Sequence, residues 1–394
     1  MPSYIHQLHT LVPPISYAQE YARDFFKSLT QDNRTRRLIH TIYQRSGIDR
    51  RHSVCADFDH NASPTLFLRN GAGQVLSPST KDRNRVYASQ ARSLAVELTR
   101  QLLADSQTFQ ASDITHVIFA SCTGFANPGP DYHLIRELGL QSHVERYTLG
   151  FMGCYAAIPA LRMAAQFCEA RPDAVVLVIC LELCSLHMQI SDQPDHILAN
   201  SLFADGAAAA LVSGIKPAAD QPAFQLLNFA TELIPSGEAE MAWEIGNEGF
   251  NIVLSSYVPD IIGANVGALV KGLLSRVGIQ SDTIGGWAVH PGGRSILDKV
   301  QAALGLPENA LASSRRVLRE FGNMSSATIL FVLKHLLSLP DYAQPAILAM
   351  AFGPGLTVET AILERIGTAA HPDATPEPIE ELFSKKPALE LAPI

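Results

Sequence analysis

The feature of this sequence that most constrains its fold is an order of segments that occurs twice. In the first instance, an apolar β-branched run ends at Cys122, and an apolar segment of helical periodicity begins at Cys154, 32 positions later. In the second, an apolar run ends at His290 and a similar helical segment begins near Asn323, 33 positions later. A strand, a loop and a helix in each instance predict an α/β fold with a duplicated half. Coincidence between two unrelated α/β stretches remains the alternative at this point.

Composition and charge narrow the class of protein. The 394 residues, 47% of them hydrophobic, suffice for one large core or for two fused halves. A formal net charge of −8 leaves no global basic field to attract nucleic acid or an anionic membrane. The six cysteines and the absence of a secretory pattern in residues 1–10 indicate a reducing cytoplasm. The longest apolar runs, such as 174–181, are shorter than the roughly 20 residues that cross a bilayer, so no integral membrane contact is expected.

The duplication suggests how the chain is divided. We expect an N-terminal half at residues 1–220 that carries the cysteine, and a C-terminal half at residues 221–366 that carries the histidine and the asparagine. The continuous apolar run AVVLVICLEL at 174–183 is typical of a central strand covered on both faces. The segment 367–394 is rich in Pro, Ala and Glu without apolar periodicity, so it is expected to be a disordered tail.

Cys154 is a candidate nucleophile. A cysteine in the first turn of a helix lies at the positive end of the helix dipole, which favours the thiolate. Its small neighbours Gly153 and Ala156 leave room for an acyl thioester. A structural cysteine in an apolar helix is the alternative interpretation.

His290 and Asn323 are candidate partners of this cysteine. His290 ends an apolar strand and precedes Gly292 and Gly293, which leave space for a ligand, although a packed core histidine has the same pattern. Asn323 could donate to a substrate oxygen or merely cap the helix that follows. Together, an imidazolium beside the sulfur would stabilise the thiolate, and His with Asn would stabilise a thioester enolate. The three residues fit carbon–carbon bond formation on thioesters and also thiol hydrolysis.

Five segments resemble, in order, the signatures of type III polyketide synthases, the chalcone and stilbene synthase-like family, here of bacterial type. They are GFMGCYAAIPALRMA, LFADGAAAALVS, WAVHPGGRSILD, FGNMSSATILFVL and AFGPGLTVE, within residues 5–367. The resemblance implies a thiolase-like fold, with two duplicated α/β halves in a layered αβαβα core, and a homodimer. It implies that an acyl-CoA starter loads onto Cys154 and that malonyl-CoA is decarboxylated beside His290 and Asn323 and adds by Claisen condensation. CoA thioesters are the substrates, and no cofactor is implied.

The resemblance also implies residues for the substrate pocket. Phe203 matches a gatekeeping phenylalanine, and Ile252 falls near a second gatekeeper that is usually aromatic. Arg45 aligns with a cation for the CoA phosphates. Further substrate-binding candidates are Cys122, Thr123, Asn127, Cys184, His187, Gly292, Gly293 and Ser325, with Asn127 at the position from which a partner subunit closes the cavity.

The substrate is less constrained than the reaction. Cys184 and His187 stand where plant chalcone synthases carry threonines, which argues against a flavonoid product. Together with Ile252 and Cys122, which would help to open an acyl tunnel, they favour a long-chain fatty acyl starter and an alkylpyrone or alkylresorcinol product. An initiating β-ketoacyl-ACP synthase and a non-catalytic partner subunit of the same fold are alternatives. No CxxC pair exists, so no metal site is expected.

Overall fold

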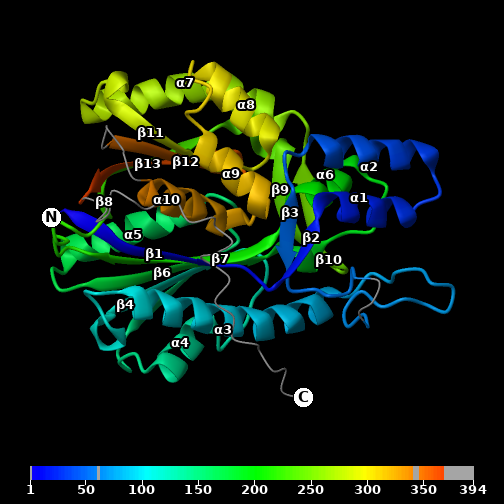
Figure 1. Ribbon diagram of the computed structural model, residues 1–394, viewed down its shortest axis with the longest axis horizontal. Coiled ribbons are helices and arrows are strands. Elements are labelled where there is room, and N and C mark those ends of the chain that lie inside the picture. The colour runs from blue at the N-terminus through cyan, green and yellow to red at the C-terminus, as the bar shows by residue number, and fades with distance from the viewer. Residues whose placement is uncertain (1, 60–62, 340–345, 368–394) are drawn as a thin grey trace.

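The computed structural model describes residues 2–59, 63–339 and 346–367, so the tail expected at 367–394 lies almost entirely outside the described residues. Five layers are stacked in Figure 1: outer helices, a group of strands, central helices, a second group of strands and outer helices. The layers confirm the predicted αβαβα architecture.

Nine of the strands form one mixed sheet in the order β11-β12-β13-β8-β1-β7-β6-β4-β5. Its N-terminal strands are β1 (Ser3–Leu11), β4 (His116–Ser121), β5 (Glu145–Gly150), β6 (Val175–Leu183) and β7 (Asp205–Ser213). Its C-terminal strands are β8 (Ala223–Leu233), β11 (Ile284–Val289), β12 (Ala346–Gly353) and β13 (Thr357–Ile366). The two groups join where β1 pairs antiparallel with β8.

The pairing pattern repeats in the two halves. β4 and β6 are parallel, and β6 and β7, then β7 and β1, are antiparallel. Likewise β11 and β12 are parallel, and β12 and β13, then β13 and β8, are antiparallel. The duplication inferred from the sequence is therefore present in the topology. The division proposed between residues 220 and 221 falls in the loop from β7 to β8, and as a domain boundary it stays a prediction.

Each helical layer buries its own apolar cluster. The central helices α5 (Ala157–Ala170) and α10 (Thr328–Ser338) pack between the two groups of strands. One outer face is covered by α3 (Thr80–Asp105) and α4 (Pro130–Leu138), and the other by α7 (Val258–Val277) and α8 (Arg294–Ala303), with α9 (Ala312–Phe321) beside them. Because the sheet is covered on both faces, strands such as β6 are buried along their whole length.

Helix α7 is the one helix of the described residues that could cross a membrane by length and composition alone. Its sequence contains no long uninterrupted apolar run, because Pro259, Asp260 and Lys271 interrupt it. Its buried side chains, which include Ile262, Val266 and Leu273, belong to the apolar cluster beneath β11, β12 and α8. Helix α7 thus packs one face against the sheet and α8 as part of an outer layer, with 33% of its apolar stretch buried.

Smaller elements gather at one end of the layers, on the right in Figure 1. They are α1 (Gln19–Ser28), α2 (Asn33–Arg45), α6 (Pro194–Leu202), the strand pair β2 (Ile15–Ala18) with β3 (Arg50–Ser53), and the hairpin of β9 (Met241–Gly246) and β10 (Gly249–Leu254). Short 3-10 helices occur at Ala111–Asp113, Cys184–His187, Pro235–Glu240, Ser281–Thr283 and Ser325–Ala327. This end of the molecule holds the cavities described next.

Candidate active site

A cavity of about 630 Å³, part of it open to solvent, contains Cys154, His290 and Asn323 in its lining. Cys154 lies in the turn that precedes α5, and Asn323 lies in the loop between α9 and α10. His290 directly follows β11. The duplicated halves thus bring the three sequence-predicted residues together, each from the end of a regular element.

The turn at Cys154 depends on a glycine. Gly153 has a φ of 81°, and a Cβ there would lie 2.6 Å from Cδ of Pro354. Only glycine fits both the left-handed backbone and the close approach of the Pro354 loop. The loop GPG at 353–355 therefore packs directly against the backbone of the candidate nucleophile.

Cys154 differs from the other cysteines in its exposure. All six cysteines lie in described residues and are free, and five are buried. Cys154 alone is partly exposed, and its surface faces the cavity. Reactive cysteines need this access, whereas buried structural cysteines are inert.

Hydrogen bonds fix the orientation of the Asn323 amide. Its Oδ1 accepts from the backbone N–H of Ser325 at 2.9 Å, and its Nδ2 donates to the carbonyl of Gly292 at 3.3 Å. The amide lies 3.9 to 4.0 Å from Cys154 Sγ. Of the two N–H groups of the amide, one donates to Gly292 and the other is directed at Cys154 Sγ, where the oxygen of a thioester bound at the sulfur would accept it.

The imidazole of His290 is buried, and neither ring nitrogen has a hydrogen-bond partner among the described residues. Buried polar atoms are nearly always paired, so an unpaired ring in a cavity wall points to a ligand that completes it. Gly292 leaves the space: a Cβ there would lie 3.7 Å from His290 Nε2 and 2.9 Å from Ile296 Cδ1.

Burial favours the neutral forms of the His290 imidazole and the Cys154 thiol when each is considered alone. It lowers the pKa of His290 to about 3 and raises the pKa of Cys154 to about 11. A hydrogen bond from Ser325 acts in the opposite direction on the thiol. A thiolate and an imidazolium that form together carry no net charge. Their mutual attraction offsets the desolvation cost that burial imposes on each charge alone.

The remaining pocket candidates divide into two groups. Those that line the Cys154 cavity are Cys122, Thr123, Cys184, Phe203, Ile252, Gly292 and Ser325. Those that do not are Asn127, which is exposed, Gly293, which precedes α8, His187 and Arg45. Arg45 is exposed at the last turn of α2 and lines neither this cavity nor the one beside it.

His187 is a wall residue with both nitrogens engaged. Its Nε2 lies 2.7 Å from the carbonyl of Thr123, and its Nδ1 accepts from the N–H of Phe250 at 3.1 Å. The ring stacks on Phe250 with centroids 4.0 Å apart. Burial lowers the pKa of His187 to about 4, so the ring is neutral.

The sequence analysis missed two residues next to the cavity. Glu182 is fully buried, and its carboxylate accepts from the N–H of Cys122 and the hydroxyl of Thr123, both at 2.9 Å. A charged residue inside the apolar run 174–183 was the available signal. Trp243 lines the cavity beside Ile252, its cross-strand partner, and donates from Nε1 to the carbonyl of Cys122 at 2.9 Å. It lies in a polar stretch that gave no signal.

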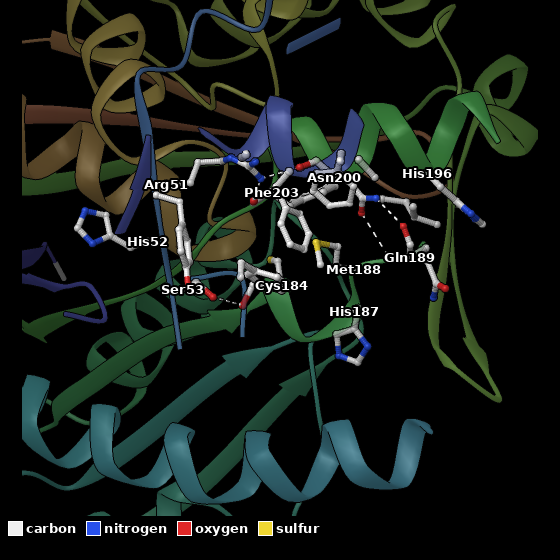
Figure 2. A pocket seen from close by; sticks show the side chains of 18 of the residues that line it. Arg51, His52, Ser53, Cys184, His187, Met188, Gln189, His196, Asn200 and Phe203 are labelled. Atoms are coloured by element: carbon white, nitrogen blue, oxygen red, sulfur yellow. Dashed lines mark hydrogen bonds between the residues drawn. The ribbon is translucent and has the colours of Figure 1, made fainter. Parts of the chain in front are cut away.

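A second cavity, of about 760 Å³ including open solvent, adjoins the first. Figure 2 shows Cys184, Met188 and Phe203 on its walls. Its far side is formed by α1 and its neighbours, with the apolar or aromatic side chains of Tyr17, Tyr21, Ala22, Phe25, Phe26 and Phe58. The two cavities share Cys184, Phe203, Trp243 and Ile252.

No group of three or more His, Cys, Asp or Glu side chains that could hold a metal occurs in residues 2–59, 63–339 and 346–367.

Comparison with known proteins assigns the family. Residues 4–217 match the family model "Chalcone and stilbene synthases, N-terminal domain", and residues 225–367 match the corresponding C-terminal domain. The chain is 31% identical over 366 residues to "Alpha-pyrone synthesis polyketide synthase-like Pks18" of Mycobacterium tuberculosis, covering 92% of this chain and 91% of that protein. It is 32% identical over 371 residues to bisdemethoxycurcumin synthase of Oryza sativa subsp. japonica, covering 90% of each.

Solved structures agree in fold. PKS-I of the brown alga Ectocarpus siliculosus superposes with a TM-score of 0.85 at 28% identity, covering 93% of this chain and 98% of that one. The C-terminal type III polyketide synthase domain of Steely1 from Dictyostelium gives a TM-score of 0.84 at 29% identity, covering 93% and 100%. The fold is therefore that of the type III polyketide synthases, and the chain belongs to the chalcone and stilbene synthase family of acyl-CoA- and malonyl-CoA-dependent acyltransferases.

Proposed function

We propose that this synthase loads an acyl-CoA starter onto Cys154 and extends it by iterative decarboxylative Claisen condensation with malonyl-CoA. The observation that carries the assignment of residues is the cavity in which the one partly exposed cysteine meets an unpaired buried imidazole and an oriented amide. That combination supplies a nucleophile, a proton acceptor and a donor to a thioester oxygen.

Loading needs the thiol proton to move. His290 accepts it from Cys154 Sγ, and the sulfur attacks the acyl carbon of the starter thioester. The CoA thiolate leaves and takes the proton back from His290, which restores the neutral ring. The cysteine then carries the acyl group, and the cavity is ready for malonyl-CoA.

Extension uses the same donors on a second thioester. His290 and the N–H of Asn323 that is directed at Cys154 Sγ hold the malonyl thioester oxygen, so that loss of carbon dioxide leaves an enolate stabilised on that oxygen. The enolate carbon attacks the acyl carbon on Cys154, a carbon–carbon bond forms and the sulfur leaves. The lengthened chain is now a CoA thioester that can be loaded again.

We propose a long-chain fatty acyl starter and an alkylpyrone or alkylresorcinol product. The second cavity supports this because its aromatic walls adjoin the Cys154 cavity and suit an apolar tail. The relative Pks18 is named for α-pyrone synthesis, which agrees with a lactone product. The family match disfavours the initiating β-ketoacyl-ACP synthase, and an accessible Cys154 disfavours a non-catalytic partner subunit.

The remaining parts of the proposal concern assembly and location. We propose a cytoplasmic homodimer that needs no cofactor besides its CoA thioester substrates. The exposed Asn127, beside Phe125 with 45% of its surface accessible, supports a contact through which this loop reaches a second subunit.

A panel of acyl-CoAs from two to eighteen carbons, incubated with labelled malonyl-CoA and no acyl carrier protein, tests the proposal. We expect labelled pyrones or resorcinols, with the highest kcat/KM for long chains, and no product from Cys154→Ala. Condensation that depends on malonyl-ACP would favour the β-ketoacyl-ACP synthase. A preference for short or aromatic starters would refute the proposed substrate class and leave the reaction standing.

A further inference from the structure

Arg51, a residue of β3, holds the carboxyl end of α6. Its Nη1 donates to the carbonyls of Asn200 at 2.6 Å and Phe203 at 2.8 Å, and its Nε donates to Gln19 Oε1 at 2.9 Å. Gln19 in turn donates to the carbonyl of Ser201 at 2.7 Å. Figure 2 shows the guanidinium of Arg51 beside Asn200 and Phe203. Carbonyls that a helix leaves unpaired at its end are thus taken by this arginine and its glutamine partner.

The segment that Arg51 holds is bonded to the loop of Asn323. The N–H of Asn323 donates to the carbonyl of Leu202, and the N–H of Ala204 donates to the carbonyl of Asn323, both at 2.9 Å. These two bonds make an isolated parallel bridge between Phe203 and Asn323. A displacement of the α6 end therefore moves a wall residue of both cavities and the oriented amide together.

A second contact links Arg51 to the same loop. Gly322, which precedes Asn323, has a φ of 73°. A Cβ at Gly322 would lie 2.8 Å from Cγ of Arg51 and 3.0 Å from the carbonyl of Leu202. The aliphatic part of Arg51 and the backbone before Asn323 are thus in close contact. Position 322 requires glycine because of this close approach and because of its left-handed φ.

The charge of Arg51 has no carboxylate as its direct partner. No carboxylate in the described residues forms an ion pair with it, although the buried carboxylate of Asp205 attracts it electrostatically, and its hydrogen bonds go to carbonyls and an amide. The carboxyl end of a helix carries partial negative charge, which a cation stabilises. The planar fork of arginine reaches three acceptors at once, which the single ammonium of lysine cannot do in the same geometry.

We propose that Arg51 is a positioning residue: it fixes Phe203 and Asn323 relative to each other and thereby sets the amide that receives the malonyl thioester. Arg51 does not reach the reacting atoms itself. The expected effect on decarboxylation rests on the proposed function. The expected effect on the position of Asn323 rests on the hydrogen-bonded bridge alone.

The kinetic test compares two partial reactions in Arg51→Met and Arg51→Lys. Malonyl-CoA decarboxylation needs the Asn323 amide, whereas alkylation of Cys154 by iodoacetamide does not. Because small misplacements of catalytic groups commonly cost up to about 100-fold in rate, we expect at least about a tenfold loss of decarboxylation per folded Arg51→Met molecule. Alkylation should stay within about twofold, and Arg51→Lys should fall between the wild type and Arg51→Met.

The matched control is Arg365→Met. Arg365 likewise donates to a carbonyl at the end of a helix, that of Leu337 in α10, and it lines neither cavity. We expect it to leave the ratio of decarboxylation to alkylation unchanged. Equal ratios in Arg51→Met and Arg365→Met would overturn the positioning role, and if Arg51→Met fails to fold, an unchanged ratio in Arg51→Lys would do so.

Hydrogen exchange tests the same idea without any reaction. The N–H groups of Ala204 and Asn323 should exchange at least about tenfold faster in the Arg51 variants and at the wild-type rate in Arg365→Met. Unchanged exchange at both amides would refute the positioning role even if the wild type proved to have another activity. A wild type that does not decarboxylate malonyl-CoA would instead refute the proposed function.

Discussion

Asn323 Oδ1 lies 3.9 Å from Cys154 Sγ, although 169 positions separate the two residues in the sequence. One comes from the loop before α10 and the other from the turn before α5, the two helices that fill the middle layer. The site is therefore assembled across the two halves, and no isolated half would contain it.

Replacement of Asn323 by alanine should separate the two partial reactions. Removing one donor to a developing oxyanion commonly costs about 100-fold or more in rate, so we expect decarboxylation to fall by that amount. Acyl loading should change far less, because the sulfur and His290 remain. Single-turnover measurements of both steps check this, and an equal fall in both would identify Asn323 as a structural cap.

The pH dependence of Cys154 should report on His290. A positive ring beside the sulfur favours the thiolate, so we expect the alkylation midpoint of the wild type to lie below the ordinary cysteine pKa of about 8.5. In His290→Ala this attraction is lost while burial, which raises the pKa of Cys154, remains, so the midpoint should move upward. Iodoacetamide alkylation followed against pH measures both midpoints.

An unchanged midpoint in a folded His290→Ala protein would show that the ring does not act on the sulfur. Circular dichroism provides the control for folding. Decarboxylation should fall in the same variant, since a donor to the thioester oxygen is lost.

Filling the second cavity should shorten the preferred starter. Ala22 is a small, buried residue of α1 in the wall of that cavity, and phenylalanine there would occupy the space proposed for the acyl tail. We expect kcat/KM for long-chain acyl-CoA to fall at least about tenfold, while short starters change by less than about twofold. Asp24→Phe, on the exposed side of the same helix, is the control, and equal effects on all chain lengths would argue against the tail site.

Glu182 should contribute to stability through its two acceptor oxygens. Its carboxylate accepts from Cys122 and Thr123 on one oxygen and from the hydroxyl of Ser326 on the other. Glutamine would place an NH₂ group against one of these donors, so we expect a loss of about 1–3 kcal/mol in the free energy of unfolding.

Urea unfolding measures this loss. The exposed Glu20→Gln provides the control and should stay within about 0.5 kcal/mol of the wild type. A Glu182→Gln protein as stable as that control would mean that these hydrogen bonds do not stabilise the fold.

Local patterns predicted a duplicated α/β half and suggested Cys154, His290 and Asn323 as partners, whereas the five layers were implied by the resemblance to the family. Continuous apolar runs identify strands covered on both faces, and the residue at the end of each run follows from its position. The nearly equal spacing of the two halves then places the histidine and asparagine opposite the cysteine. The sequence predicted that Cys154 lies in the first turn of a helix, whereas in the structure the helix begins three residues later, at Ala157.

The second cavity could not be predicted, because it depends on packing between elements that are distant in sequence. Its walls come from α1, β3, α6 and the β9–β10 hairpin, which give no shared periodicity. His187 was predicted to line the substrate cavity. In the structure its ring stacks on Phe250 and lies in the wall of the second cavity, which adjoins the Cys154 cavity. Trp243 likewise reaches the cavity because its strand pairs with that of Ile252, and nothing in the sequence near Trp243 indicates this.

The most direct test of the account is to locate the starter on the protein. Intact-protein and peptide mass spectrometry after incubation with an acyl-CoA should find the acyl group on Cys154, the one partly exposed cysteine, and on no other cysteine. Cys154→Ala should remain unmodified. An acyl group on Cys122 or Cys184, with Cys154 unmodified, would contradict the central claim.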